Sequence, residues 1–101
     1  MLLLIGGNKL EHNPFISFND GLEITYSDLK KNTDGTNYVS IYFEAPNEKG
    51  TEFNSARFDF PGDSFTDVKG YSPEALDNLK EHVKKGGNLM LNFSMEKAAL
   101  A

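Results

Sequence analysis

Three glycine-containing turns divide the first sixty residues and constrain the fold more than any other feature of the sequence. Asn19-Asp20-Gly21 separates two alternating apolar runs, and an Asp-Gly pair in that setting is typical of a tight β-hairpin. Asn32-Thr33-Asp34-Gly35 and Asn47-Glu48-Lys49-Gly50 each carry Asn first and Gly fourth, which suits a type I turn closed by a left-handed glycine. The turns predict a meander of four antiparallel strands, near residues 14–18, 22–29, 37–45 and 51–60.

Apolar and polar residues alternate along the predicted strands, so each strand has two different faces. Val39, Ile41 and Phe43 share one face of the third strand, and Tyr38 and Tyr42 lie on the opposite face. Strict alternation is typical of an antiparallel sheet with one buried face and one more exposed face. If a helix covers the Val39 face, the two tyrosines lie on the side away from it.

Start and stop signals predict one helix over residues 73–85. In the Ser72-Pro73 pair, serine is a suitable N-cap and proline suits the first helical position. Leu76, Leu79 and Val83 follow at spacings of three and four residues and form a single apolar stripe. Because the stripe is narrow, the pattern indicates a helix that covers a sheet.

A C-terminal strand is predicted directly after this helix. Gly86 is expected to end the helix, because glycine adopts the left-handed conformation of a helix C-terminus at little cost. Every second residue from Leu89 to Met95 is apolar, which predicts a strand over residues 88–95 with one buried face. Met90 falls on the other face of this strand.

Two further segments complete the predicted fold. Residues 61–71 show no regular pattern and are expected to be irregular, whereas Met1–Ile5 is apolar throughout and suits a strand covered on both sides. The chain is expected to form a single α+β domain over residues 1–101. Its mostly antiparallel sheet has about five or six strands, including the hairpin meander of residues 14–60, and one helix packs on it.

Charge and cysteine content exclude several classes of function. The chain has no cysteine, and its 15 acidic and 10 basic residues give a formal net charge of −5. Without cysteine there is no disulfide, no thiolate metal site and no thiol nucleophile. A negative balance disfavours nucleic-acid binding, which requires basic side chains to neutralise phosphates. No apolar run approaches the ~20 residues that span a bilayer, so we expect no membrane contact and a cytoplasmic location.

Residue types that support catalysis or metal binding form no recognised pattern. His12 and His82 lack a second histidine at metal-ligand spacing, and no serine lies in a Gly-x-Ser-x-Gly turn. Asp59, Asp63 and Asp67 are spaced by four residues, but a Pro-Gly pair between them prevents a shared helical face. We therefore predict no catalytic residues, no metal and no cofactor.

The outer face of the meander is the strongest candidate for a functional surface. It carries Tyr38 and Tyr42, and Arg57 is expected on a neighbouring strand. Tyrosine and arginine are enriched at the centres of protein interfaces. Two interpretations stay open: these residues form a partner-binding face, or the tyrosines cover a second small core made by the N-terminal strand and residues 61–71.

These features favour a small cytoplasmic, non-catalytic domain of bacterial or phage type that acts by protein–protein contact. Its partner is another protein, or a second copy of the chain bound through a sheet edge or the tyrosine face. The alternative is a small enzyme or ligand-binding domain with a pocket between helix and sheet, where His12 or His82 works with an Asp or Glu. A third interpretation is a structural or regulatory subunit that binds an acidic partner through the lysine end of the helix, with Lys80, Lys84 and Lys85.

Overall fold

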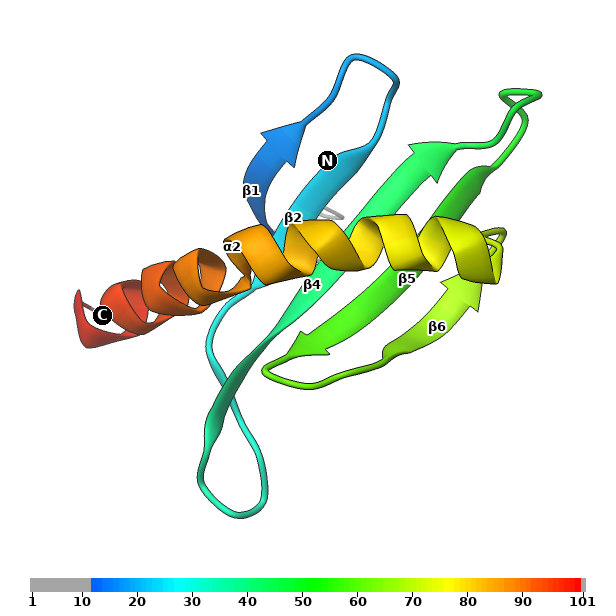
Figure 1. Ribbon diagram of the computed structural model, residues 1–101. Coiled ribbons are helices and arrows are strands. Elements are labelled where there is room, and N and C mark those ends of the chain that lie inside the picture. Colours follow the sequence, from blue (N-terminus) through cyan, green and yellow to red (C-terminus); the bar gives the residue numbers. More distant parts are fainter. Residues whose placement is uncertain (1–11, 101) are drawn as a thin grey trace, which may run out of the picture.

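The computed structural model describes residues 12–100 of the chain, which form six strands and one long helix (Figure 1). Their order along the chain is β1 (His12–Ser17), β2 (Glu23–Ser27), β3 (Lys30–Lys31), β4 (Asn37–Pro46), β5 (Phe53–Phe60), β6 (Phe65–Lys69) and α2 (Pro73–Leu100).

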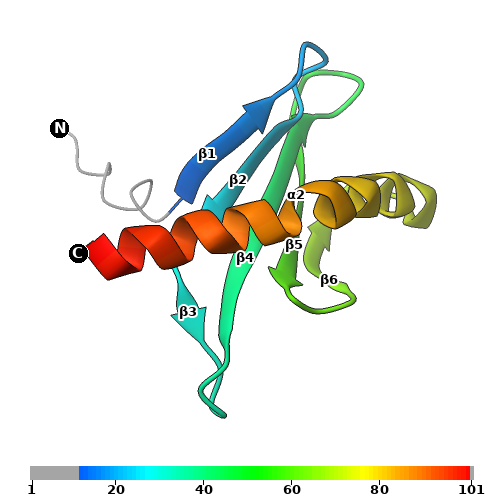
Figure 2. The ribbon, with the colours of Figure 1, turned by 60° about the vertical axis from the view of Figure 1, so that its left-hand side comes forward.

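All strands pair antiparallel in one six-stranded sheet with the order β1-β2-β4-β5-β6, and β3 pairs with the start of β4. Apart from β3, strands that follow one another along the chain lie side by side, which confirms the predicted α+β fold with a meander-like sheet. Figure 2 shows β3 and the start of β4 extending below the helix as a separate hairpin. The predicted strand at 22–29 corresponds to β2, and β3 begins just beyond its predicted end.

The predicted turns are present. Gly21, Gly35 and Gly50 all have positive φ, at 99°, 90° and 72°. The amide of Gly35 donates to the carbonyl of Asn32, and the amide of Gly50 donates to that of Asn47, both at 3.0 Å. These contacts are those of a turn with Asn first and a left-handed Gly fourth, so the local turn chemistry sets the strand order.

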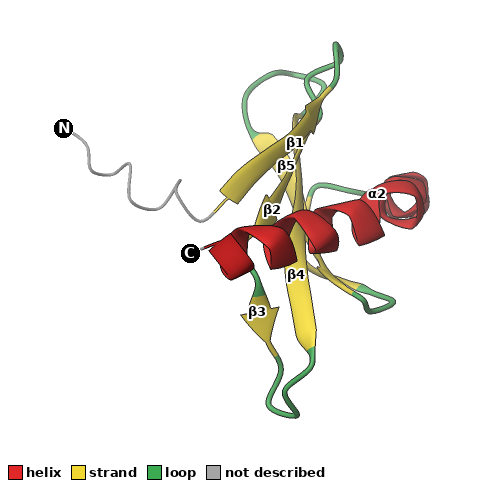
Figure 3. Ribbon diagram, turned by 90° about the vertical axis from the view of Figure 1, so that its left-hand side faces the viewer, coloured by secondary structure: helices red, strands yellow, loops and turns green. Residues whose placement is uncertain are grey.

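Helix α2 lies across one face of the sheet (Figure 3). The strands supply most of the core beneath it, and the helix supplies a stripe at helical spacing. The buried cluster consists of Ile24, Val39, Ile41, Phe43, Phe58, Leu79, Val83 and Met90. The predicted Val39, Ile41 and Phe43 face is therefore the helix-covered face.

The helix begins where the sequence predicts. The Ser72 hydroxyl accepts a hydrogen bond from the Ala75 amide at 3.1 Å, which is the expected N-cap contact. Its far end differs from the prediction, because α2 continues to Leu100 and no strand follows it within the described residues. The predicted strand over residues 88–95 is wrong. The same residues extend the helical stripe, in which Met90 is buried while Leu89 is 47% exposed.

Gly86, which is expected to end the helix, and the following Gly87 instead allow α2 to approach the sheet closely. A Cβ atom on Gly86 would lie 3.0 Å from the ring of Phe15, and one on Gly87 would lie 2.6 Å from the ring of Phe60. Glycine inside a helix costs about 1 kcal/mol relative to alanine. Here it makes room for one aromatic ring from β1 and one from β5, so the helix continues through the pair.

Residues 61–71 also differ from the prediction, because Phe65–Lys69 form β6 and extend the sheet. The Phe65 ring packs edge-on against Phe58, with centroids 5.0 Å apart, on the helix side of the sheet. The pairing runs from Ser55–Lys69 to Arg57–Thr66, so β6 has one extra residue there and does not alternate regularly. The predicted strand Met1–Ile5 lies outside the described residues.

Candidate functional site

The face of the sheet opposite α2 carries the side chains that the sequence singled out. Tyr42 pairs directly with Arg57 on β5 and with Thr25 on β2, and all three alternate away from the helix-covered residues. Tyr38 has the same parity on β4 but lies about 13 Å from Tyr42, four residues along an extended strand. No element among residues 12–100 covers this face, which we call the open face (Figure 3).

His12 on β1 stacks on the ring of Tyr42, with ring centroids 3.9 Å apart and planes 11° from parallel. Each of these side chains is half-buried. Because β2 lies between β1 and β4, the two rings meet across β2 on the open face, next to Thr25, which pairs with Tyr42. The Thr25 hydroxyl is buried and has no hydrogen-bond partner among the described residues. The sequence did not indicate this stack, because β1 was predicted to begin at residue 14.

Arg57 is held between two aspartates on the open face. Its Nη1 lies 2.9 Å from Asp67 Oδ2, and its Nε lies 3.3 Å from Asp59 Oδ1, although Nε makes no hydrogen bond. Asp67 interrupts β6 with a φ of 53°, a left-handed conformation that aspartate tolerates better than most residues. Strand alternation predicts Asp59 beside Arg57, whereas Asp67 follows only once β6 is known.

A second polar contact joins β3, β4 and β5. The Ser40 hydroxyl donates to Asp59 Oδ1 at 2.7 Å and accepts from Lys30 Nζ at 3.3 Å. Ser40 is 1% exposed, and its amide donates to the hydroxyl of Ser27. Polar contacts therefore run across the open face from β3 to β6, and Asp59, one of the two aspartates beside Arg57, is itself held by Ser40.

A hollow of about 180 Å³ lies beside Arg57. It is lined by Tyr42, Glu44, Ser55, Ala56, Arg57 and Asp67. The structure thus brings Tyr42 and Arg57 together and leaves Tyr38 at the far end of the face. One interpretation of the sequence is that residues 61–71 help to form a second small core over the tyrosines. These residues form no such core, because β6 joins the edge of the sheet instead of covering its open face.

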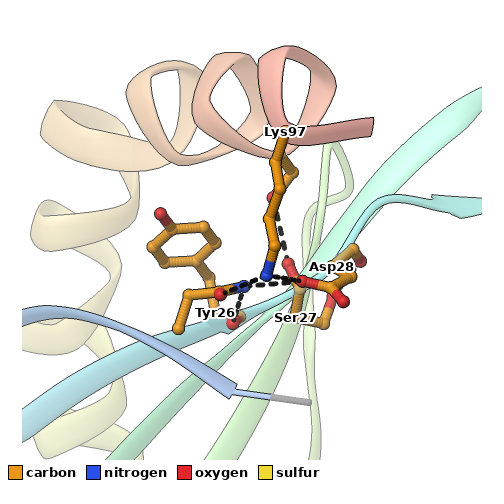
Figure 4. Close-up of polar contacts among 6 residues, drawn as sticks. Tyr26, Ser27, Asp28 and Lys97 are labelled. Atoms are coloured by element: carbon orange, nitrogen blue, oxygen red, sulfur yellow. Dashed lines mark hydrogen bonds and ion pairs between the residues drawn. The ribbon is translucent and has the colours of Figure 1, made fainter. Parts of the chain in front are cut away.

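A different hollow of about 200 Å³ lies between the last turns of α2 and the segment after β2. It is lined by Asp28, Leu29, Ser94, Lys97 and Ala98, with no histidine among them. Figure 4 shows the adjoining contact of Lys97 with Asp28, in which Nζ lies 2.9 Å from Oδ1. The Ser94 hydroxyl donates to the Ser27 carbonyl. These contacts fasten the helix end to the sheet.

The Asp28 carboxylate accepts hydrogen bonds from Asn13 and from Lys97, and both lower its pKa, with Asn13 the larger cause. A lowered pKa means that this contact stabilises the fold above the ordinary range of aspartate, and that the contribution is lost as the pH falls through the folded-state pKa. We expect Asn13→Ala to raise the pKa of Asp28 by removing one hydrogen bond, and Lys97→Met to raise it by removing both a hydrogen bond and a positive charge. Carboxyl NMR titration measures both changes.

Asp34 is the internal control for this titration. The pKa of Asp34 is also lowered, but by the side chain and amide of Thr36 within its own turn. Neither substitution touches that turn, so the Asp34 pKa should stay constant. An unchanged Asp28 pKa in both variants would show that β1, the segment after β2 and the end of α2 do not meet in solution.

In the part of the chain that the structure describes, neither histidine forms an ion pair with an Asp or Glu. His12 stacks on Tyr42, and His82 packs its ring against Phe18 with centroids 5.2 Å apart. Among residues 12–100 there is no group of three His, Cys, Asp or Glu side chains placed to hold a metal ion. Over the same range, α2 is not apolar enough to cross a membrane.

Comparisons with protein-family models, with curated proteins and with solved structures find no match to this chain.

Proposed function

We propose that the protein is a small, non-catalytic interaction domain that binds a protein partner through the open face of its sheet. The observation that carries the proposal is the arrangement in two layers: α2 covers one face of the sheet, while the opposite face presents Tyr42 stacked on His12 beside Arg57, which is paired with two aspartates. Aromatic and arginine side chains held rigidly in place lose little conformational entropy on binding, which favours them as interface anchors.

The open face suits a partner better than the sheet edges do. β1 carries Pro14, which has no amide to donate, and its pairing shifts register between Pro14 and Ile16. β6 at the other edge is interrupted at Asp67. Irregular edges resist the addition of another strand. A homodimer or a partner complex therefore uses the face in this proposal, not continuous strand pairing.

Site-specific photo-cross-linking tests the proposal. A benzophenone amino acid at Ser55 lies on the lining of the hollow, and the same group at Asp77 lies on the exposed side of α2 as the matched control. In the native host we expect a discrete adduct from position 55, absent from position 77 and reduced by Tyr42→Ala. Equal adducts from both positions, or none from position 55, would contradict the proposal.

A further inference from the structure

We propose that the partner presents a basic side chain, lysine or arginine, to the open face, with its cation beside Glu23 and Glu44 and its stem against Tyr42. The inference rests on the proposed function and specifies the chemistry of the partner. It follows from the charges on the open face and from their distribution around the hollow.

Two carboxylates of like charge stand directly opposite each other on this face. Glu23 on β2 is the cross-strand neighbour of Glu44 on β4, and both side chains are exposed. Neither forms an ion pair with any residue between 12 and 100. Like charges at directly opposed positions destabilise a sheet. A cation between the two carboxylates would turn this repulsion into two attractions.

The nearest cation of the protein itself does not fill this role. Arg57 shares the hollow with Glu44 but already faces Asp59 and Asp67, one on each side. Its charge is therefore compensated without Glu44. The hollow keeps an excess of negative charge, in line with the net charge of −5 carried by the whole chain. Such a field attracts basic partners and speeds their encounter.

Tyr42 supplies the second half of the recognition. It lies next to Glu44 on the same face of β4, and its other neighbour, His12, holds the ring by stacking. A lysine or arginine packs its aliphatic stem along an aromatic surface while its charged end stays in water. A cation near a tyrosine ring gains a further attraction from the ring electrons. An aromatic ring beside two free carboxylates suits an ammonium or guanidinium group.

A metal ion suits the site less well. Ca²⁺ takes six to eight oxygen ligands, and the pair offers two carboxylates from an exposed strand surface. The described residues add no third acidic or histidine ligand there. An ammonium or guanidinium group needs only a few acceptors, so the basic side chain is the better occupant.

The probe for the first test is a ten-residue peptide of alternating lysine and serine with blocked ends, followed by amide chemical shifts. We expect shifts on β2, β4 and β5, with affinity weakened at least fivefold by Glu23→Gln with Glu44→Gln. Glu48→Gln with Glu96→Gln removes the same charge from exposed positions outside the face and should change affinity less than twofold. Equal weakening by both pairs would show attraction by net charge alone and overturn the proposal.

A second test separates a binding role from a structural one. Glu23→Lys replaces the like-charge pair with an opposite-charge pair, so we expect the melting temperature to rise by about 2–4 °C. The same variant should lose affinity for the lysine peptide at least tenfold, because its own cation occupies the site. A more stable variant that still binds the peptide as wild type would overturn the proposal.

Failure of this inference is distinguishable from failure of the proposed function. Cross-linking from position 55 that depends on Tyr42, together with no binding of the lysine peptide, would leave the open face as the interface and overturn its basic partner. Binding of a matching glutamate–serine peptide would overturn it in the same way. No cross-linking from position 55 would remove the proposed function itself.

Discussion

Replacing Met90 with alanine is expected to lower the free energy of unfolding by about 2–5 kcal/mol, the usual cost of emptying a buried methionine site. Met90 is 0% exposed and belongs to the core cluster beneath α2. The preceding residue, Leu89, is 47% exposed, so Leu89→Ala should cost less than about 1 kcal/mol. Urea denaturation at low temperature measures both values even if the Met90 variant is only marginally stable.

The ratio of the two effects decides between helix and strand over residues 88–95. A strand with the period-two pattern buries Leu89 and exposes Met90, which reverses the order of the two losses. A larger loss from Leu89→Ala than from Met90→Ala would therefore contradict the helix. Asn92→Ala is a control, because Asn92 is exposed and alanine favours a helix by a fraction of a kcal/mol.

The hairpins and the start of the helix are predicted correctly from the sequence because local chemistry determines them. Each turn has an asparagine or aspartate that bonds its own backbone and a glycine with positive φ, so the hairpins need no distant information. The helix start has the same character, since Ser72 caps it directly. Strand β6 lies beyond such rules, because its extra residue opposite Ser55–Arg57 breaks the alternation.

The end of the molecule was mispredicted because two periodicities coexist there. Leu89, Leu91, Phe93 and Met95 alternate like a strand, while Val83, Met90 and Ser94 keep the helical stripe. Distant contacts decide between them. Ser94 donates to the Ser27 carbonyl, and Lys97 donates to Asp28 and Asn13. These three acceptors lie about seventy or more residues earlier in the chain. No local pattern contains that information.

The sequence predicts which face of the sheet carries the candidate site, but it identifies only some of the residues that form it. The alternation of apolar and polar residues places Tyr42 on the face away from the helix, with Arg57 on a neighbouring strand. The pairing of Tyr42 with Arg57 between β4 and β5 confirms that placement. His12 and Asp67 were missed because both lie where a strand begins or bulges. Their binding role stays a prediction, which the cross-linking and peptide experiments address.

Gly87→Val is the other large effect we expect, at about 2–3 kcal/mol of lost stability. A Cβ at this position would lie 2.6 Å from Cε2 and 2.7 Å from Cδ2 of Phe60, so the ring or the helix must move. If Gly87 instead began a strand, valine would be favourable there, because β-branched residues suit strands. The sign of the change therefore reports whether the helix passes through the glycine pair.

A matched variant isolates the steric part of this effect. Asn88→Val introduces the same side chain at the next, exposed helical position, where asparagine and valine have similar helix propensities, so stability should change little. Shortening the opposing ring by Phe60→Leu should reduce the cost of Gly87→Val, because residues in contact give non-additive effects. Additive losses in the double variant would mean that Phe60 does not oppose Gly87. In that case, removing the Phe60 ring would not have made room for valine at position 87. Other contacts would then have to explain why α2 lies so close to β5.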